Sequence, residues 1–124
     1  MKARVILAAA LCAFSGGKAL HGSGLLQLQI SPLIARAPGV ITVRTVVDAS
    51  DDNRSLEVMA TSLDFTRRST IDLDGRAAPR VNVFAFAHMP AGEYEVSAVL
   101  IGPSGVRATA ARTVLIMPTP GSRR

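Results

Sequence analysis

The chain has 124 residues, of which 48% are hydrophobic and 19% are charged, and it contains one cysteine, one tyrosine and no tryptophan. Its 14 basic residues outnumber its nine acidic residues; without Lys2 and Arg4, which lie at the amino end, 12 basic residues leave a net charge of +3. Because Arg123 and Arg124 place two of those charges on a terminal tail, the charge balance gives no indication of nucleic-acid binding.

The amino end has the pattern of an export signal. A short basic start, Met1 to Arg4, precedes an apolar run from Val5 to Phe14, which is shorter than the roughly 20 residues that span a membrane. Small residues follow this run, as signal peptidase requires. We predict a signal peptide at residues 1–17, cleaved after Ser15 or Gly17, and a periplasmic or secreted mature protein without a transmembrane anchor.

Cys12 is the one cysteine of the chain and lies inside this apolar run. Lipidation of Cys12 is an alternative outcome of export, but Ala9 and Leu11 depart from the lipoprotein pattern, which favours a cysteine that only fills the run. Removal of the signal leaves a mature chain without cysteine. That excludes disulfides, thiolate metal sites and thiol catalysis together.

Beyond the signal, apolar residues alternate with polar ones, as in LLQLQI at residues 25–30. The predicted strands span 25–30, 41–48, 55–63, 69–73, 81–87, 93–101 and 106–117, with turn residues between them. The strand at 81–87 is apolar on both faces, which predicts a central position with both sides covered. We predict one all-β domain, an antiparallel seven-stranded sandwich over 25–117, followed by a flexible tail at 118–124.

The one tyrosine follows a turn and begins an alternating strand, in the sequence MPAGEYEV at residues 89–96. This segment resembles the tyrosine corner of immunoglobulin-like and fibronectin type III domains, in which the ring enters the core and the hydroxyl bonds the preceding backbone. In this resemblance Pro90 stiffens the corner, Gly92 supplies an unusual backbone conformation and Tyr94 supplies the bond. The alternative is a tyrosine on an exposed strand face.

The resemblance is to the superfamily, covers most of residues 25–117 and implies an immunoglobulin-like sandwich. The chain departs from antibody domains because it has no tryptophan on a third strand and no cysteine pair. Sandwiches like those of fibronectin type III, bacterial immunoglobulin-like and carboxypeptidase-regulatory domains all fit. What these families share is a role as scaffold or binding module.

Candidate metal ligands gather in one loop. Asp48, Asp51, Asp52 and Asn53 offer the oxygen atoms that Ca²⁺ prefers, although the loop lacks the alternating ligands and the bidentate Glu of an EF-hand. Asp and Asn also dominate ordinary turns, and Arg54 can neutralise the acids. A plain turn is therefore the competing interpretation.

Copper is a second metal hypothesis, because histidine and methionine bind it. The residues concerned are His21, His88, Met59, Met89 and Met117. They form no HxH motif and no methionine cluster, and a lone histidine at a strand end is typical of a surface. We expect no resident cofactor, with calcium as the metal to test.

Catalytic chemistry has no recognisable pattern in the sequence, which lacks a spaced Ser-His-Asp set and a glycine-rich phosphate loop, so we do not expect an enzyme. Phe84 and Phe86 share one strand face, which packs in the core or, if exposed, forms an interaction face. We expect a non-catalytic module that binds another envelope or secreted protein through a sheet edge or this face. The alternative is a small periplasmic protein that binds a ligand or metal, calcium or copper, through the loop at 48–53.

Overall fold

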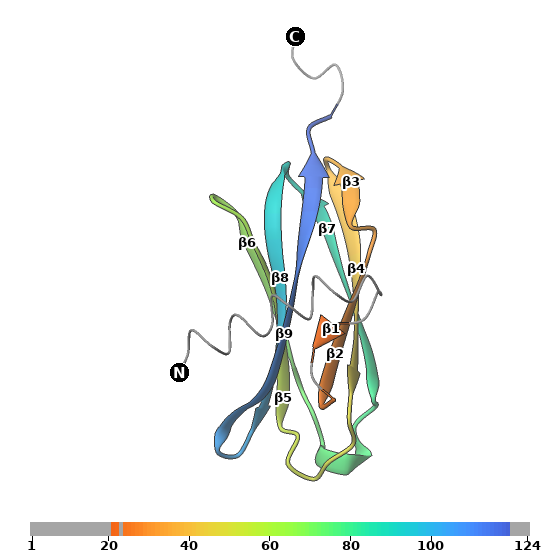
Figure 1. Ribbon diagram of the computed structural model, residues 1–124, viewed down its shortest axis with the longest axis vertical. Coiled ribbons are helices and arrows are strands. Elements are labelled where there is room, and N and C mark those ends of the chain that lie inside the picture. The colour runs from red at the N-terminus through yellow and green to blue at the C-terminus, as the bar shows by residue number, and fades with distance from the viewer. Residues whose placement is uncertain (1–20, 23, 120–124) are drawn as a thin grey trace.

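Nine strands and one 3₁₀ turn form the part of the chain that the computed structural model describes, residues 21, 22 and 24–119 (Figure 1). The elements are β1 (His21–Gly22), β2 (Leu26–Ser31), β3 (Ile34–Arg36), β4 (Gly39–Val47), β5 (Ser55–Thr61), β6 (Thr66–Asp72), η1 (Gly75–Ala77), β7 (Val81–Met89), β8 (Gly92–Gly102) and β9 (Gly105–Met117). The predicted signal peptide, Cys12 and residues 120–124 of the tail lie outside the described residues. Within them, no helix has the length and apolar character needed to cross a membrane.

The prediction of seven strands was too low. Each predicted range overlaps a strand, but β1 and β3 are additional. They span two and three residues, which is too short to produce a visible alternation, and β3 lies between Pro32 and Pro38. A three-residue strand of this kind is defined by its neighbour, because Ile34 pairs with Leu115 of β9.

The strands form two sheets. Sheet A has the order β1-β2-β4-β7 and sheet B the order β3-β9-β8-β5-β6. All pairs are antiparallel except β3 with β9, which is parallel. The antiparallel prediction therefore holds for every pair but this one.

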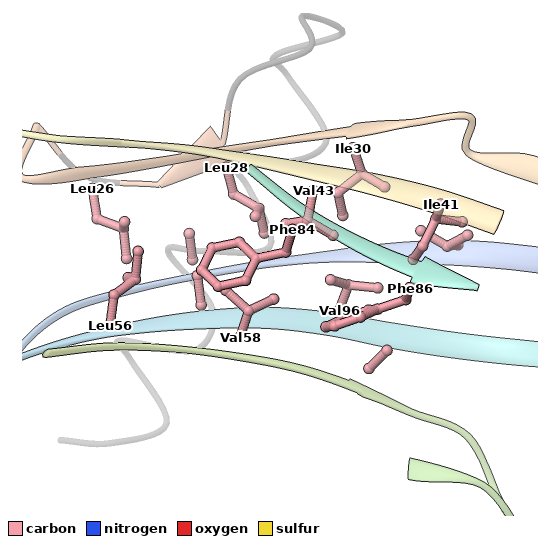
Figure 2. Close-up of a cluster of buried hydrophobic side chains, with 14 of the residues drawn as sticks. Leu26, Leu28, Ile30, Ile41, Val43, Leu56, Val58, Phe84, Phe86 and Val96 are labelled. Carbon is pink, nitrogen blue, oxygen red and sulfur yellow. The ribbon is translucent and has the colours of Figure 1, made fainter. Parts of the chain in front are cut away.

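The core lies between the sheets because alternate residues of each long strand point inward. In β4 every second residue from Gly39 to Val47 is buried, and β8 follows the same pattern. Figure 2 shows side chains of the two layers meeting: Leu26 of β2 lies opposite Leu56 of β5, and Phe84 of β7 points toward Val58 of β5. Each such fully buried aliphatic or aromatic side chain contributes roughly 1.5–3 kcal/mol of transfer free energy.

The strand predicted to be central is an edge strand instead. Among residues 21, 22 and 24–119, β7 pairs only with β4, at the end of sheet A. Its inner residues Phe84 and Phe86 are 7% and 3% exposed, but its outer residues Val81 and Val83 are 41% and 60% exposed. The sequence places apolar residues on both faces of this strand, so the pattern does not show that the outer face is exposed to solvent.

Sheet B is wider than sheet A on the side where β6 lies. Every other strand of six or more residues has a buried face, whereas β6 alternates between exposed and half-buried residues only. Val58, which Phe84 faces, pairs with Ser69 of β6. β7 therefore lies over β5, and β6 extends one strand beyond it with its inner face only half-buried.

Candidate functional site

The corner between β7 and β8 is closed by Tyr94. Its side chain is fully buried, and its hydroxyl donates to the backbone oxygen of Pro90 at 2.7 Å. Pro90 is exposed in the turn, and Gly92 begins β8 with a φ of 159°. The structure thus brings together the three residues that the sequence grouped as a corner, with the ring in the core rather than on an exposed face.

Side chains from the β5–β6 turn and from β6 surround Tyr94. Phe65 meets its ring edge to face, with 6.2 Å between centroids, and the guanidinium of Arg67 lies 5.6 Å from the centroid of Phe65. Burial raises the pKa of Tyr94, a hydrogen bond with Ser62 acts in the opposite sense, and the charge of Asp64 adds to the rise. The hydroxyl is therefore held as a neutral donor, which is a structural role.

A hollow of about 720 Å³ opens beside this corner. Its lining includes the carboxylates of Asp64, Glu93 and Glu95, together with Ser62 and the fully exposed Leu63. Ser62 already donates to the backbone oxygen of Phe65 at 3.3 Å. No histidine, lysine or arginine lines this hollow, so it offers no cation to hold an anion.

The loop of the calcium hypothesis is folded around Asn53. Asn53 is 2% exposed, its Nδ2 donates to the backbone oxygen of Asp48 at 2.9 Å, and its Oδ1 accepts from Arg107. Both polar ends of the side chain are therefore in use, and its oxygen faces a cation that is part of the protein.

Two of the three acids of the same loop, Asp48 and Asp51, pair with arginines. Asp51 lies 3.4 Å from Arg76, and Asp48 lies 3.9 Å from Arg80, in exposed ion pairs. In the described part of the chain, no group of three or more His, Cys, Asp or Glu side chains is placed to hold a metal ion. The arrangement is that of a turn fastened by a buried amide.

The residues of the copper hypothesis are not brought together. His88 is exposed at a φ of 58°, at the irregularity where β7 has an extra residue against β4. Met89 is fully buried in the core, and Met59 lies on the outer face of sheet B, where Arg68 donates to its sulfur at 3.7 Å. Met117 ends β9, and the side chain of His21 lies outside the described residues.

The interaction face suggested for Phe84 and Phe86 is not exposed. Both rings point between the sheets, beside Val58 and Val96 (Figure 2). The two residues belong to the core, which was the other interpretation of their spacing. Any binding role of this strand must come from its outer face or its edge.

The free edge of β7 is the feature that the sequence did not reveal. The backbone N–H of Val47 in β4 donates to Arg80 just before β7, so even-numbered residues of β7 direct their backbone groups toward β4. The oxygen of Ala87 accepts from Arg67 of β6 at 3.1 Å, which places odd-numbered residues on the other side. The N–H and C=O groups of Val81, Val83 and Ala85 therefore point away from sheet A.

The four sheet edges differ in how they are protected. β1 and β3 span two and three residues, and β6 carries Arg67, Arg68 and Asp72. β7 spans nine residues without a lysine, arginine, aspartate or glutamate. Short strands and charges are the usual devices that prevent edge pairing, and β7 has neither along residues 81–86.

The fold and this site define a class: an all-β sandwich of two sheets, in which one long, uncharged edge is left unpaired by the strands of the described residues. Solved structures of similar fold include a superoxide reductase (neelaredoxin) from Ignicoccus hospitalis, with a TM-score of 0.61 and 11% identity over 77% of this chain and 82% of that chain. The sulfur carrier protein SoxY from Chlorobium limicola f thiosulfatophilum has a TM-score of 0.56 and 16% identity over 90% and 96%.

A third similar structure is a family 76 glycoside hydrolase from a bovine Bacteroides thetaiotaomicron strain, with a TM-score of 0.51, 17% identity and coverage of 77% of this chain but 20% of the enzyme. No family model matches the chain, and no curated protein matches it. At such identities the likeness concerns the fold alone.

Proposed function

We propose that the protein is an exported, non-catalytic sandwich module that binds another envelope or secreted protein through the free edge of β7. The observation that carries this proposal is the length of that edge without charge, next to three edges that are short or charged. An exposed edge of this kind is a template for another strand.

The proposal includes an immunoglobulin-like or fibronectin type III-like subtype. Its support is the strand order, in which β2, β4 and β7 face a sheet that contains β9, β8, β5 and β6 in that order. The bond from Tyr94 to Pro90 at the start of the penultimate strand is a further point in favour. Neither feature depends on an antibody-like tryptophan or disulfide.

A pull-down tests the proposal. The tagged exported protein is used to capture partners from envelope extract, read by mass spectrometry, in chelator and again in added Ca²⁺. Val83→Lys places a charge beside the free edge, and Val106→Lys is the matched control because these valines are 60% and 63% exposed. A partner retained in chelator by wild type and by Val106→Lys, but lost by Val83→Lys, is the expected result.

Other results would change the assignment. Retention that requires Ca²⁺ would favour the metal-binding alternative at the loop of Asp48 and Asn53. A partner that both variants retain would keep the interaction role but move it away from β7. No partner under either condition would contradict the interaction role itself.

A further inference from the structure

The free edge of β7 and the half-buried inner face of β6 form one step at the margin of the sandwich. β7 ends sheet A above β5, and the half-buried inner residues of β6, which are Arg67, Ser69 and Ile71, extend beyond it. Figure 1 shows β6 at the margin of the molecule. A strand added to β7 would therefore gain both a backbone ladder and a surface beneath it.

The overhang of β6 decides between two occupants of this step. If two copies paired through antiparallel β7 strands, their second sheets would lie on the same side of the joined sheet. The β6 strand of each copy would then enter the space that β5 of the other copy occupies. A single extended segment brings no second layer and avoids this overlap.

The inner face of β6 has a defined chemical order. Ile71, near the start of β7, is partly buried against the core; Ser69 is in the middle; Arg67 is near Ala87. Arg67 donates one bond to Ala87 and makes no salt bridge with a carboxylate of the described residues. A guanidinium has five donors, so it can accept a carboxylate from a ligand as well.

We infer that the ligand of this step is an extended segment of another exported protein, added antiparallel to β7, with an acidic, a small and an apolar side chain at alternate positions in that order. The acid meets Arg67, the small residue lies over Ser69 and the apolar residue covers Ile71. The antiparallel direction follows the rest of sheet A. This inference rests on the proposed function and names the chemistry of its partner.

The backbone of the ligand pairs with the residues whose groups are free. Val81, Val83 and Ala85 each present one N–H and one C=O to the incoming strand, while the oxygen of Ala87 remains with Arg67. The outer side chains of the ligand stay in solvent beside Val81 and Val83, so their identity matters less. Specificity comes from the inward positions, and affinity comes from the ladder.

Amide hydrogen exchange with a defined peptide tests this inference. The probe is the acetylated and amidated peptide Thr-Asp-Thr-Ser-Thr-Val-Thr, added to the isotope-labelled exported protein. The control peptides carry Lys in place of Asp, or the same residues in reversed order. The expected result is slower exchange at Val81, Val83 and Ala85, with no change at Asn82 and Phe84, which already face β4, and binding at least about tenfold tighter than that of either control.

Variants of the protein separate the contribution of the Arg67 side chain from that of the backbone hydrogen bonds along β7. Arg67→Glu should reverse the preference, so that the Lys peptide binds better than the Asp peptide. Val83→Pro removes a free-edge donor without removing a bond to β4 and should weaken binding of the Asp peptide about tenfold, whereas Val83→Thr keeps the donor and should not. If Val83→Pro lowers the melting temperature, the test depends on the Arg67→Glu variant and on whether it prefers the Lys peptide to the Asp peptide.

Three outcomes would overturn the inference. Equal binding of the three peptides would contradict the proposed order of side chains. Absence of binding at millimolar peptide would contradict the existence of the site. A dimer seen by ultracentrifugation and abolished by Val83→Pro would make a second copy the occupant. The pull-down distinguishes these failures from failure of the proposed function, because an envelope partner captured in chelator would still support an interaction module.

Discussion

Replacing Tyr94 with phenylalanine isolates the bond that closes the corner between β7 and β8. The substitution removes the hydroxyl that donates to Pro90 at 2.7 Å and leaves the ring and its edge-to-face contact with Phe65. Because Pro90 is exposed, its oxygen can accept from water once the hydroxyl is gone. The expected loss of unfolding free energy is therefore about 1 kcal/mol, near the typical value for one net hydrogen bond.

Urea denaturation followed by circular dichroism measures this loss. Fluorescence is unsuitable because Tyr94 is the only tyrosine and the chain has no tryptophan. For a domain of this size, about 1 kcal/mol corresponds to a fall of roughly 4–8 °C in melting temperature. Tyr94→Ala, which also removes the ring, should cost about 3–5 kcal/mol and serves as the positive control. An unchanged midpoint in Tyr94→Phe, with a large loss in Tyr94→Ala, would refute the assignment of a stabilising corner bond.

Three further predictions concern titration, the buried amide and a surface ion pair. Burial raises the pKa of Tyr94 above its usual 10.0, so at high pH the folded protein keeps a proton that the unfolded chain loses. The contribution of Tyr94 to the free energy of unfolding should therefore be fully present below about pH 10 and should decrease as the pH rises further. Urea midpoints measured against pH should show this decrease in the wild type and not in Tyr94→Phe. Asn53→Ala should lower stability by about 1–3 kcal/mol in thermal melts, because the donor of Arg107 and a backbone acceptor lose their partner; a neutral result would contradict the role of Asn53 as the fastening of its loop. Glu57→Gln should change stability by less than about 1 kcal/mol, because the Arg68 side chain is 61% exposed and solvent screens the pair; a larger loss would mean that this pair is not screened.

The parts of the fold that could be predicted are those encoded locally. Alternation along β4 and β8 marks the inner face directly, since every second residue must avoid water. The corner could also be read because Tyr94 and Pro90 are only four residues apart. β3 gave no such signal, because its three residues form a strand only through pairing with β9, about 80 residues later.

The candidate site was harder to predict because its properties are not local. Asn53 could be recognised as a turn residue, but its second partner, Arg107, is 54 positions away, so the sequence left metal binding open. The edge position of β7 depends on which strands pair with it. No pattern within residues 81–89 distinguishes an edge from a central strand.

The error about β7 nevertheless bears on the proposed function. A strand with apolar residues on both faces is typical of one covered on both sides, and the described residues cover only the side of Phe84 and Phe86. Val81 and Val83 remain exposed beside an unpaired backbone, and the adjacent inner face of β6 remains half-buried. An added strand would pair the free backbone groups and cover the face of β6, and a bound partner would shield the outer valines. If the proposed function holds, the sequence pattern of a covered strand and the structure of an open edge agree, because a bound partner would supply the cover.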